Sequence, residues 1–388
     1  MVAQFMRLDN RAGPPYNQKM KTMVIFGTRP EVIKLAPVIR EFQRRQDPSQ
    51  IYMLATAQHR QLLDQMLKTF GLTSDRDLDL MAPDQSLAQL SSRVITGVSE
   101  VLAEVKPDLV IVQGDTTTAM ASALAAFYRK IRVAHVEAGL RTGDPANPFP
   151  EEINRKIISS VADFHFAPTS LAVQNLKNEG IPARKIRQTG NTVVDALQFI
   201  KERLDSPGGT RLPVKVKPDS RIILVTSHRR ENFGPPLEHI CRALIELVGR
   251  YKDVEIVYPV HPNPNVKKTA VRLLAKHERI HLIQPLDYLQ LLQLMKKSYL
   301  VLTDSGGIQE EAPSFRKPVL VMRDTTERPE GIRAGVARLV GTRSETIVAE
   351  AARILESRAV YRKMTSGRNP YGDGRAARRI VDFLLRLT

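Results

Sequence analysis

Short apolar runs of strand length alternate with helical patterns along almost the whole chain, and this alternation restricts the fold more than any other feature. The runs form two series: residues 22–26, 51–55, 108–112, 132–136, 164–168 and 185–189, then residues 221–227, 255–260, 280–283, 299–303 and 318–322. Alternation of this kind is typical of parallel sheets with helices on both faces. The sequence therefore predicts an α/β protein with two doubly wound, Rossmann-like domains and a cleft between them.

The length of the chain, 388 residues, also favours two domains, because a single hydrophobic core rarely serves so many residues. Residues 201–220 are rich in proline, glycine and charge, which is typical of a linker. We expect an N-terminal domain over residues 21–200 and a C-terminal domain over residues 221–370. A helix over residues 371–388 is expected to pack back on the N-terminal domain. Residues 1–20 lack the apolar segment of a secretory signal and are expected to form a flexible leader.

The composition narrows the class of partner. The net charge of +17 suggests nucleic acid, but the 58 basic residues are spread along the chain, and aromatic residues make up only 5%. Stacking platforms for single strands are therefore scarce, and anionic small substrates fit the charge at least as well. No stretch approaches the roughly 18 apolar residues of a membrane span. The single cysteine, Cys241, excludes an intramolecular disulfide and suits a reducing cytoplasm.

A Ser-Gly-Gly turn, residues 305–307, follows the predicted strand 299–303 and precedes a predicted helix. Strand, glycine turn and helix form the geometry in which backbone N–H groups bind a phosphate. Ser305 adds a hydroxyl, while Gly306 and Gly307 permit close backbone approach. Glu310 and Glu311 lie about one turn further on, where a carboxylate can accept hydrogen bonds from a ribose diol. The segment indicates a nucleotide site; the alternative is an ordinary connection with acidic residues at a helix start.

Charged side chains follow several other predicted strands, at the edge where parallel sheets bind ligands. The candidates are Arg29 and Lys34 after residues 22–26, Asp115 after 108–112, Glu137 after 132–136, Glu151 at a helix start, and His228 after 221–227. Taken alone, Asp115 is better explained as a helix N-cap. Arg29 can bind a phosphate with its fork of donors; the alternative is a surface arginine at a helix start. Together, three carboxylates, a histidine and an arginine at one predicted cleft favour a catalytic site.

Several familiar signatures are absent from the sequence. There is no GxxxxGK[ST] motif, and the histidines show no HExxH or Cys/His spacing, so metal catalysis has no support. Residues 372–377 match GxGxxA, but the preceding Asn-Pro-Tyr is not a strand, so a dinucleotide site is not indicated. We therefore expect neither a metal nor a bound cofactor.

Many segments, taken in order from about residue 21 to the end, resemble the non-hydrolysing UDP-N-acetylglucosamine 2-epimerases. They are GTRPEVIK, TAQHRQLLDQ, GDTTT, HVEAGLRTGD, PFPEEINR, GNTVVDAL, SHRRENFG, YPVHPNPN, LTDSGGIQEEAPS, VMRDTTERPEG and NPYGDGRAA. The resemblance implies a fold like the two-domain, B-type glycosyltransferases, a UDP-sugar substrate and a homodimer. It also implies interconversion of UDP-N-acetylglucosamine and UDP-N-acetylmannosamine by elimination and re-addition of UDP.

The resemblance also implies roles for individual residues. The positions that match catalytic residues of the family are Asp115, Glu137, Glu151 and His228, with Lys34 close to the chemistry. The positions that match its UDP contacts are Arg29, Ser305, Gly306, Gly307 and Glu311. An allosteric site for a second UDP-N-acetylglucosamine is matched by Gln58, Gln61, Arg229 and His261.

Three positions depart from the family pattern, and two other enzyme classes stay open. Leu291 stands where an aromatic residue near the uracil is common, and Asp84 replaces a basic or small residue at the implied allosteric site. Arg316 occupies a position where glycine is common, so that turn is expected to differ. The alternatives are a hydrolysing epimerase, which releases free sugar, and a retaining glycosyltransferase of the same fold. Nucleic-acid binding is suggested by charge alone.

Overall fold

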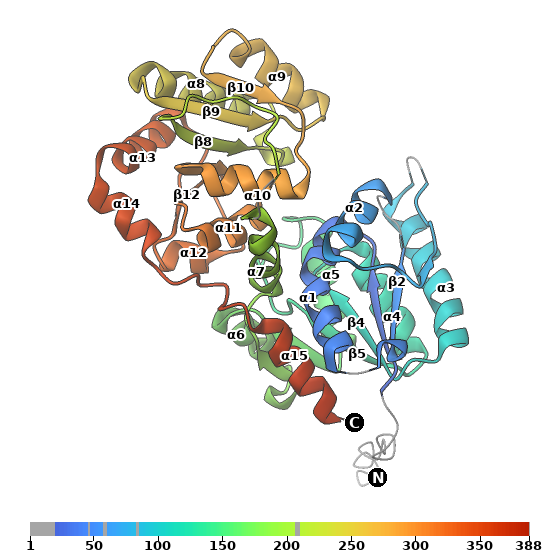
Figure 1. Ribbon diagram of the computed structural model, residues 1–388. Coiled ribbons are helices and arrows are strands. Elements are labelled where there is room, and N and C mark those ends of the chain that lie inside the picture. Colours follow the sequence, from blue (N-terminus) through green and yellow to red (C-terminus); the bar gives the residue numbers. More distant parts are fainter. Residues whose placement is uncertain (1–19, 46, 57–59, 83–84, 206–209, 388) are drawn as a thin grey trace. The chain divides into compact units, whose positions relative to one another are not determined.

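The computed structural model describes residues 20–45, 47–56, 60–82, 85–205 and 210–387, with the exceptions of a few side chains (Figure 1). Gln58 and Asp84 lie outside the described residues, as do the Gln61 side chain and the expected leader apart from Met20. The chain divides into two compact units. One comprises the described residues up to Ala196 together with those from Gly374 onward, and the other comprises Leu197–Asp373. The division lies within a helix, α7 (Thr192–Leu204), whereas the sequence had suggested a linker over residues 201–220.

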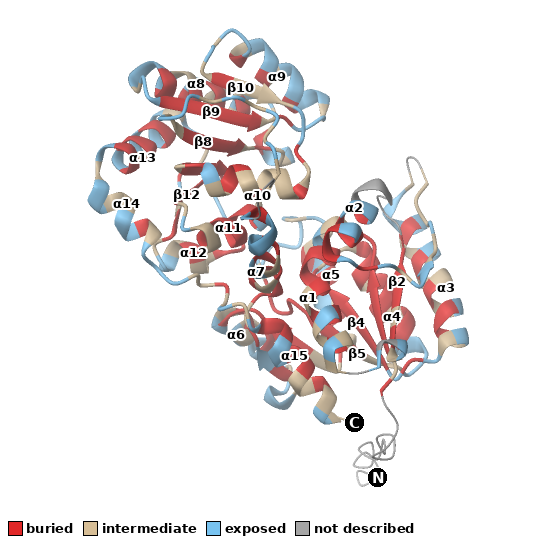
Figure 2. Ribbon diagram, viewed as in Figure 1, coloured by how far each residue is buried: buried red, intermediate tan, exposed pale blue. Residues whose placement is uncertain are grey.

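The N-terminal unit is built on a sheet whose described strands are all parallel. In sheet order they are β3 (Arg76–Asp77), β2 (Ile51–Ala55), β1 (Thr22–Phe26), β4 (Leu109–Gln113), β5 (Arg132–Val136), β6 (Phe164–Ala167) and β7 (Ile186–Gln188). The six predicted strands of the first series are confirmed, and β3, only two residues long, is an addition. Continuous apolar runs are what a parallel sheet covered on both faces requires, and the central strands are buried (Figure 2).

Helices cover this sheet because their apolar residues recur at helical spacing. They are α1 (Arg29–Arg45), α2 (Arg60–Phe70), α3 (Leu87–Val105), α4 (Thr117–Tyr128), α5 (Glu151–Val161), α6 (Ser170–Asn178), the start of α7, and α15 (Ala376–Leu384). Helix α15, from the end of the chain, packs in this unit. The Asp195 carboxylate accepts hydrogen bonds from the backbone N–H groups of Ala376 and Ala377 at its N-terminus, and Phe383 packs edge-on against Phe164.

The C-terminal unit repeats the architecture with a second parallel sheet. In sheet order its described strands are β10 (Ile280–Ile283), β9 (Val254–Pro259), β8 (Arg221–Thr226), β11 (Leu300–Thr303), β12 (Val319–Val321) and β13 (Ala337–Leu339). The helices are α8 (Pro235–Arg250), α9 (Pro264–Leu274), α10 (Tyr288–Lys297), α11 (Gly306–Glu311), α12 (Pro329–Arg333), α13 (Ser344–Glu356) and α14 (Arg358–Thr365). The predicted fold class, two doubly wound parallel sheets, is confirmed.

Two local details differ from what the sequence suggested. The helix begins within the Ser-Gly-Gly segment, at Gly306 rather than after it, and it is short: α11 spans six residues and continues as a 3₁₀ turn, Ala312–Phe315. Arg316 ends that turn in the left-handed conformation, with φ +54° and ψ +46°. An arginine thus adopts the conformation that glycine adopts most easily, which costs roughly 1–2 kcal/mol.

Among the residues that the structure describes, none of the helices has the length and apolar character that crossing a bilayer requires.

Candidate functional site

In the N-terminal unit, strand order reverses between β1 and β4, and the turns after these strands lie next to each other. Glu31, which is buried in the first turn of α1, ties them together. Its carboxylate accepts hydrogen bonds from the backbone N–H groups of Gly27 (2.9 Å) and Thr28 (2.7 Å) and from the Thr116 hydroxyl (2.6 Å). Burial raises the pKa of Glu31, although these hydrogen bonds oppose the shift. The turns that carry Arg29 and Asp115 are therefore fixed to each other.

The sequence analysis did not select Glu31, although a signal was present. Residues 28–31 read Thr-Arg-Pro-Glu, which matches the S/T-x-x-E pattern found at helix starts. Arg29 itself is the first residue of α1 and is partly exposed.

Glu137 follows β5 in a strained, enclosed position. Its φ is +66°, in the left-handed region that a glutamate rarely adopts, and the residue is 8% exposed. Lys34 Nζ lies 2.5 Å from its Oε1, Asn191 Nδ2 donates to the same oxygen at 2.9 Å, and Gln113 Nε2 donates to Oε2. Strain of this kind costs about 1–3 kcal/mol and persists where the surroundings fix the residue, often at functional sites. The structure thus joins two predicted site residues, Lys34 and Glu137, in a buried ion pair.

Asp115 does not cap α4. The N-cap residue is Thr116, whose hydroxyl accepts a hydrogen bond from the backbone N–H of Ala119 at 3.0 Å. The interpretation of Asp115 as an N-cap is therefore wrong. Its Oδ2 instead accepts a hydrogen bond from Arg155 Nε at 2.9 Å and forms an ion pair with Nη2 at 2.7 Å, and its side chain is 27% exposed. Asn154 Nδ2 donates to the backbone carbonyl of Asp115 at 2.9 Å, so helix α5 holds this turn twice.

The adjacent glutamates at the start of α5 have different surroundings. Glu152 is fully buried and accepts hydrogen bonds from the backbone N–H groups of Thr142 and Gly143, at 3.1 Å each, and from Arg155 Nη1 at 2.9 Å. Glu151 Oε2 is also buried, but it has no hydrogen-bond partner among the described residues. A buried carboxylate oxygen without a donor is costly, so the two adjacent glutamates differ in how far their charge is compensated.

In the C-terminal unit, the corresponding reversal lies between β8 and β11, and Asp304 joins the turns that follow them. Asp304 is fully buried. Its Oδ2 accepts four hydrogen bonds, from Ser227 Oγ (2.9 Å), the backbone N–H groups of His228 (2.9 Å) and Arg229 (3.0 Å), and Asn232 Nδ2 (3.0 Å). Burial by itself would raise the pKa of Asp304, but the contact with His228 and the backbone donors lower it.

Asp304 also lies against the imidazole of His228: His228 Nδ1 is 3.2 Å from Asp304 Oδ1, an ion-pair distance. The His228 side chain is 40% exposed, and its ring stacks on that of His261 with centroids 5.8 Å apart. The sequence analysis missed Asp304, although it directly precedes the Ser-Gly-Gly turn and follows a buried strand.

Within the Ser-Gly-Gly turn, the two glycines have different surroundings. A Cβ atom on Gly306 would lie 2.9 Å from Cζ of Arg328, so the guanidinium packs directly on the glycine. A Cβ atom on Gly307 would meet only Ser305 Oγ, at 3.9 Å. Gly306 is therefore required by a contact within the protein. The backbone at Gly307 has open space beside it, and a phosphate can approach a backbone closely only where such space exists.

The two glutamates that follow these glycines, Glu310 and Glu311, also differ in their hydrogen-bond partners. Glu310 is buried, and its Oε1 accepts a hydrogen bond from Arg328 Nε at 2.9 Å. Glu311 is 7% exposed, and its Oε1 accepts one from the Tyr288 hydroxyl at 2.9 Å. Glu310 balances the charge of an arginine, whereas Glu311 faces a neutral hydroxyl. The two carboxylates therefore have different neighbours.

Arg229, one of the residues matched to an allosteric site, lies at the edge of a buried ionic cluster. Its Nη2 is 3.5 Å from Glu327 Oε1, and Glu327 also pairs with Arg323 (2.7 Å) and Arg328 (2.6 Å). The cluster therefore connects Arg229 to the arginine that packs on Gly306.

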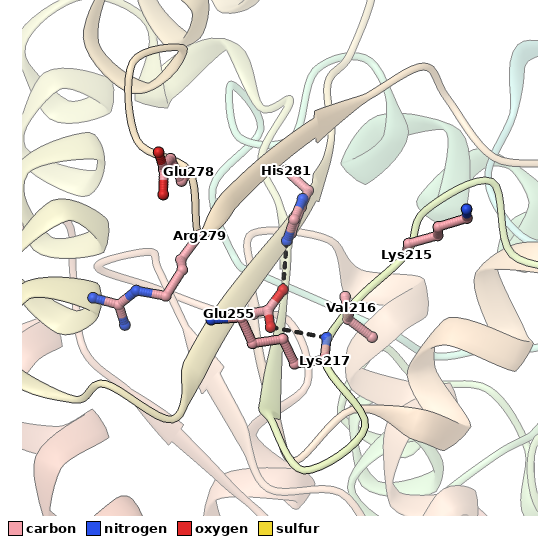
Figure 3. A pocket seen from close by; sticks show the side chains of 7 residues that line it. All are labelled: Lys215, Val216, Lys217, Glu255, Glu278, Arg279 and His281. Carbon is pink, nitrogen blue, oxygen red and sulfur yellow. Dashed lines mark hydrogen bonds and ion pairs between the residues drawn. The ribbon is translucent and has the colours of Figure 1, made fainter.

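A pocket of about 350 Å³ lies in the C-terminal unit away from all these residues, at the amino ends of β9 and β10 (Figure 3). At its centre Glu255 accepts hydrogen bonds from His281 Nε2 (2.6 Å), Ser220 Oγ (2.6 Å) and the backbone N–H of Lys217 (3.0 Å). Ligands of doubly wound sheets bind at the opposite, carboxyl ends. Since Glu255 fastens the segment before β8 to the sheet, we assign this pocket a structural role. No group of three or more potential metal ligands occurs within the described part of the chain.

Comparison with known proteins gives long, close matches. The family model for UDP-N-acetylglucosamine 2-epimerase matches residues 41–385. The probable UDP-N-acetylglucosamine 2-epimerase of Ralstonia nicotianae is 50% identical, with 93% of this chain and 97% of that protein covered. The UDP-N-acetylglucosamine 2-epimerase of Escherichia coli K12 is 48% identical, with 94% and 98% covered. The crystal structure of UDP-GlcNAc 2-epimerase from Neisseria meningitidis bound to UDP-GlcNAc is 45% identical and superposes with a TM-score of 0.88, covering 95% of this chain and 100% of that one.

Proposed function

Because the chain belongs to the UDP-N-acetylglucosamine 2-epimerase family, and is therefore an isomerase, we propose that it interconverts UDP-N-acetylglucosamine and UDP-N-acetylmannosamine by eliminating UDP and adding it back. The observation that carries the proposal is Glu137, a strained and almost buried carboxylate held against Lys34. Inversion at C2 needs groups that move a proton at that carbon. We assign this task to three acidic residues of the N-terminal unit, Glu137, Asp115 and Glu151.

The proposed step balances without a redox cofactor. The C2–H bond is not acidic beside an acetamido group, so a free carbanion is unfavourable. One carboxylate removes the C2 proton while the C1–O bond breaks and its electron pair leaves with UDP, which gives a glycal with a C1–C2 double bond. Return of a proton to the opposite face of C2, with re-addition of UDP at C1, gives the epimer. Two faces require more than one acid/base group, and Asp115, Glu137 and Glu151 share these transfers in our proposal.

The UDP moiety is assigned chiefly to the C-terminal unit. The Ser305-Gly306-Gly307 turn takes the diphosphate and Glu311 the ribose diol, while Arg29 of the N-terminal unit stabilises the charge that grows on departing UDP. His228, oriented by Asp304, assists near the phosphate. The contact of His228 with the buried Asp304 carboxylate supports this role, because a fixed donor acts on developing charge without reorganising.

Three further features are proposed with this function. A second UDP-N-acetylglucosamine binds at Gln58, Gln61, Arg229 and His261 as an activator. The enzyme is a homodimer, and two adjacent exposed aromatic residues at the end of α4, Phe127 (52% exposed) and Tyr128 (65%), are consistent with a protein contact. The enzyme acts in the cytoplasm, which the lone, buried Cys241 suits.

The test is incubation of the purified protein with UDP-N-acetylglucosamine alone, with every product identified by NMR. We expect UDP-N-acetylmannosamine in equilibrium with the substrate and no stoichiometric release of UDP. Free N-acetylmannosamine with equimolar UDP would instead identify a hydrolysing epimerase. Turnover only after addition of a sugar acceptor would identify a glycosyltransferase.

A further inference from the structure

We propose that Arg155 is a positioning residue that fixes the Asp115 carboxylate for proton transfer. This inference rests on the proposed function, since it deepens the role of Asp115 in the same reaction. Arg155 was not a candidate in the sequence, and its side chain is only 4% exposed. It therefore acts through its neighbours.

The contact is asymmetric on the aspartate. Arg155 Nε and Nη2 both bind Oδ2, at 2.9 and 2.7 Å, so Oδ1 takes no part in this contact. Two nitrogens on one oxygen restrict rotation of the carboxylate about its Cβ–Cγ bond. One oxygen is thereby held by the protein, and the other is presented in a constant direction, as a proton-transfer group requires.

The guanidinium is anchored on its other side by a fully buried residue. Arg155 Nη1 donates a hydrogen bond to Glu152 Oε2 at 2.9 Å. The Glu152 carboxylate also accepts hydrogen bonds from the backbone N–H groups of Thr142 and Gly143. The position of Arg155 is thus set by the loop that follows Glu137. Only a planar fork with several donors can join two carboxylates in this way, because the lysine ammonium is a single point.

The same helix also holds the backbone of the aspartate, because Asn154 Nδ2 donates to the Asp115 carbonyl at 2.9 Å. The turn therefore keeps a second attachment when Arg155 is replaced. Loss of Arg155 is expected to free the Asp115 side chain more than its main chain, which is why a kinetic effect is expected without loss of the fold.

The same unit contains a matched control. Arg45 also bridges two carboxylates, Glu41 four residues earlier at 2.7 Å and the distant Asp382 at 2.5 Å. It lies at the C-terminal end of α1, whereas the candidate residues Arg29 and Lys34 lie at its start. Arg45→Ala removes an ionic bridge of the same kind, although a more exposed one (Arg45 23% exposed against 4% for Arg155), without touching Asp115.

The experiment compares Arg155→Ala, Arg155→Lys, Asp115→Asn, the double variant Asp115→Asn/Arg155→Ala, and Arg45→Ala with the wild-type enzyme in steady-state epimerisation. General acid–base groups contribute about 10²–10⁴-fold, so we expect Arg155→Ala to lower kcat about 100-fold with KM changed less than about 3-fold. Arg155→Lys should recover part of kcat, and Arg45→Ala should stay within about 2-fold of wild type. Because Arg155 acts through Asp115, the double variant should be no more than about 3-fold slower than Asp115→Asn.

Undiminished kcat in Arg155→Ala, or a double variant that loses the product of the two single effects, would overturn the inference. Wild-type protein that does not epimerise the substrate would contradict the proposed function instead, so the two failures are distinct. Should Arg155→Ala not fold, Arg155→Lys and Asp115→Asn/Arg155→Lys carry the same comparison.

Discussion

Nζ of Lys34 lies 2.5 Å from Oε1 of Glu137, and the two side chains are 10% and 5% exposed. The pair joins the second turn of α1 to the residue that follows β5, more than a hundred positions away in the chain. Both charges have left water, so each depends on the other for its compensation. The pair can therefore serve the fold and the reaction together.

Replacing Glu137 by glutamine should damage both stability and activity. The amide removes the negative charge that pairs with the buried Lys34 ammonium, and breaking such a pair costs about 3–5 kcal/mol. Loss of an acid/base group should also lower kcat about 10²–10⁴-fold. Urea unfolding and epimerisation assays measure the two effects.

Glu104→Gln is the control for this prediction, because it removes the partner of Arg76 in an exposed ion pair and should leave both quantities essentially unchanged. Retention of wild-type kcat by Glu137→Gln would exclude Glu137 from the proton transfers.

Replacing Asp304 by asparagine should destabilise the C-terminal unit by about 3 kcal/mol at pH 7, because hydrogen bonds to a charged acceptor are worth about 1.5–3 kcal/mol. The pKa of Asp304 is lower in the folded protein than its usual value. The stabilisation is therefore complete above the unfolded-state pKa of about 4 and is lost as the pH falls through the folded-state pKa. Unfolding free energies of both proteins between pH 7 and pH 2.5 should converge only at the acid end. A difference that does not depend on pH would show that the charge of Asp304 is not what stabilises the fold.

We expect the folding stability of the N-terminal unit to fall in acid because of two buried histidines, His135 and His165. The two residues are partners in the register of β5 and β6, and both are fully buried. Burial lowers the pKa of His135 to about 4, and burial together with His135 lowers that of His165 to about 3. Below the unfolded-state pKa of about 6.5 the unfolded chain binds protons that the folded chain does not, so stability falls as the pH drops from 6.5 towards 4.

His165→Leu removes one of these two groups. The slope of unfolding free energy against pH over this range should become smaller by about 1.4 kcal/mol per pH unit. Chemical denaturation at several pH values gives the slope. An unchanged slope would mean that His165 does not titrate during unfolding.

The two glycines of the turn should respond differently to alanine. Gly306→Ala places Cβ 2.9 Å from Cζ of Arg328 and so displaces the guanidinium from Glu310, which should cost about 1–3 kcal/mol. Gly307→Ala meets no such obstacle and should keep or slightly increase stability, since alanine favours a helix by about 1 kcal/mol. If the backbone of Gly307 approaches a phosphate, Gly307→Ala should still weaken UDP binding in calorimetry. A stable Gly307→Ala variant with unchanged UDP affinity would contradict that approach.

The family, the fold class and the predicted strands were accessible from the sequence, because parallel strands buried on both faces leave continuous apolar runs. The second strand series was found in this way except for β13, which has only three residues. The two-residue strand β3 was missed because it contains Arg76 and Asp77 and shows no apolar pattern. Short edge strands form because a neighbouring strand offers hydrogen bonds, so their own residues give little indication of strand structure.

Individual site residues were easier to predict from the sequence than the contacts between their side chains. The position of Glu137 at the end of a buried strand marked it, but its contact with Lys34 depends on the course of the chain between them. In the segment Gly-Asp-Thr-Thr-Thr, four polar residues compete for the cap of α4, and the sequence does not reveal that Thr116 takes it. Asp304 and Arg155 were missed because each acts through another side chain, and such roles have no local pattern.

The measurement that tests the account most directly is epimerisation in D₂O with NMR of the product. Proton removal at C2 by a carboxylate that exchanges with solvent predicts deuterium at C2 of the UDP-N-acetylmannosamine formed. Variants of Asp115, Glu137 or Glu151 should in addition release the glycal and UDP. A product that retains its original C2 hydrogen in D₂O would contradict the elimination mechanism, because it would require return of the same hydrogen to the sugar.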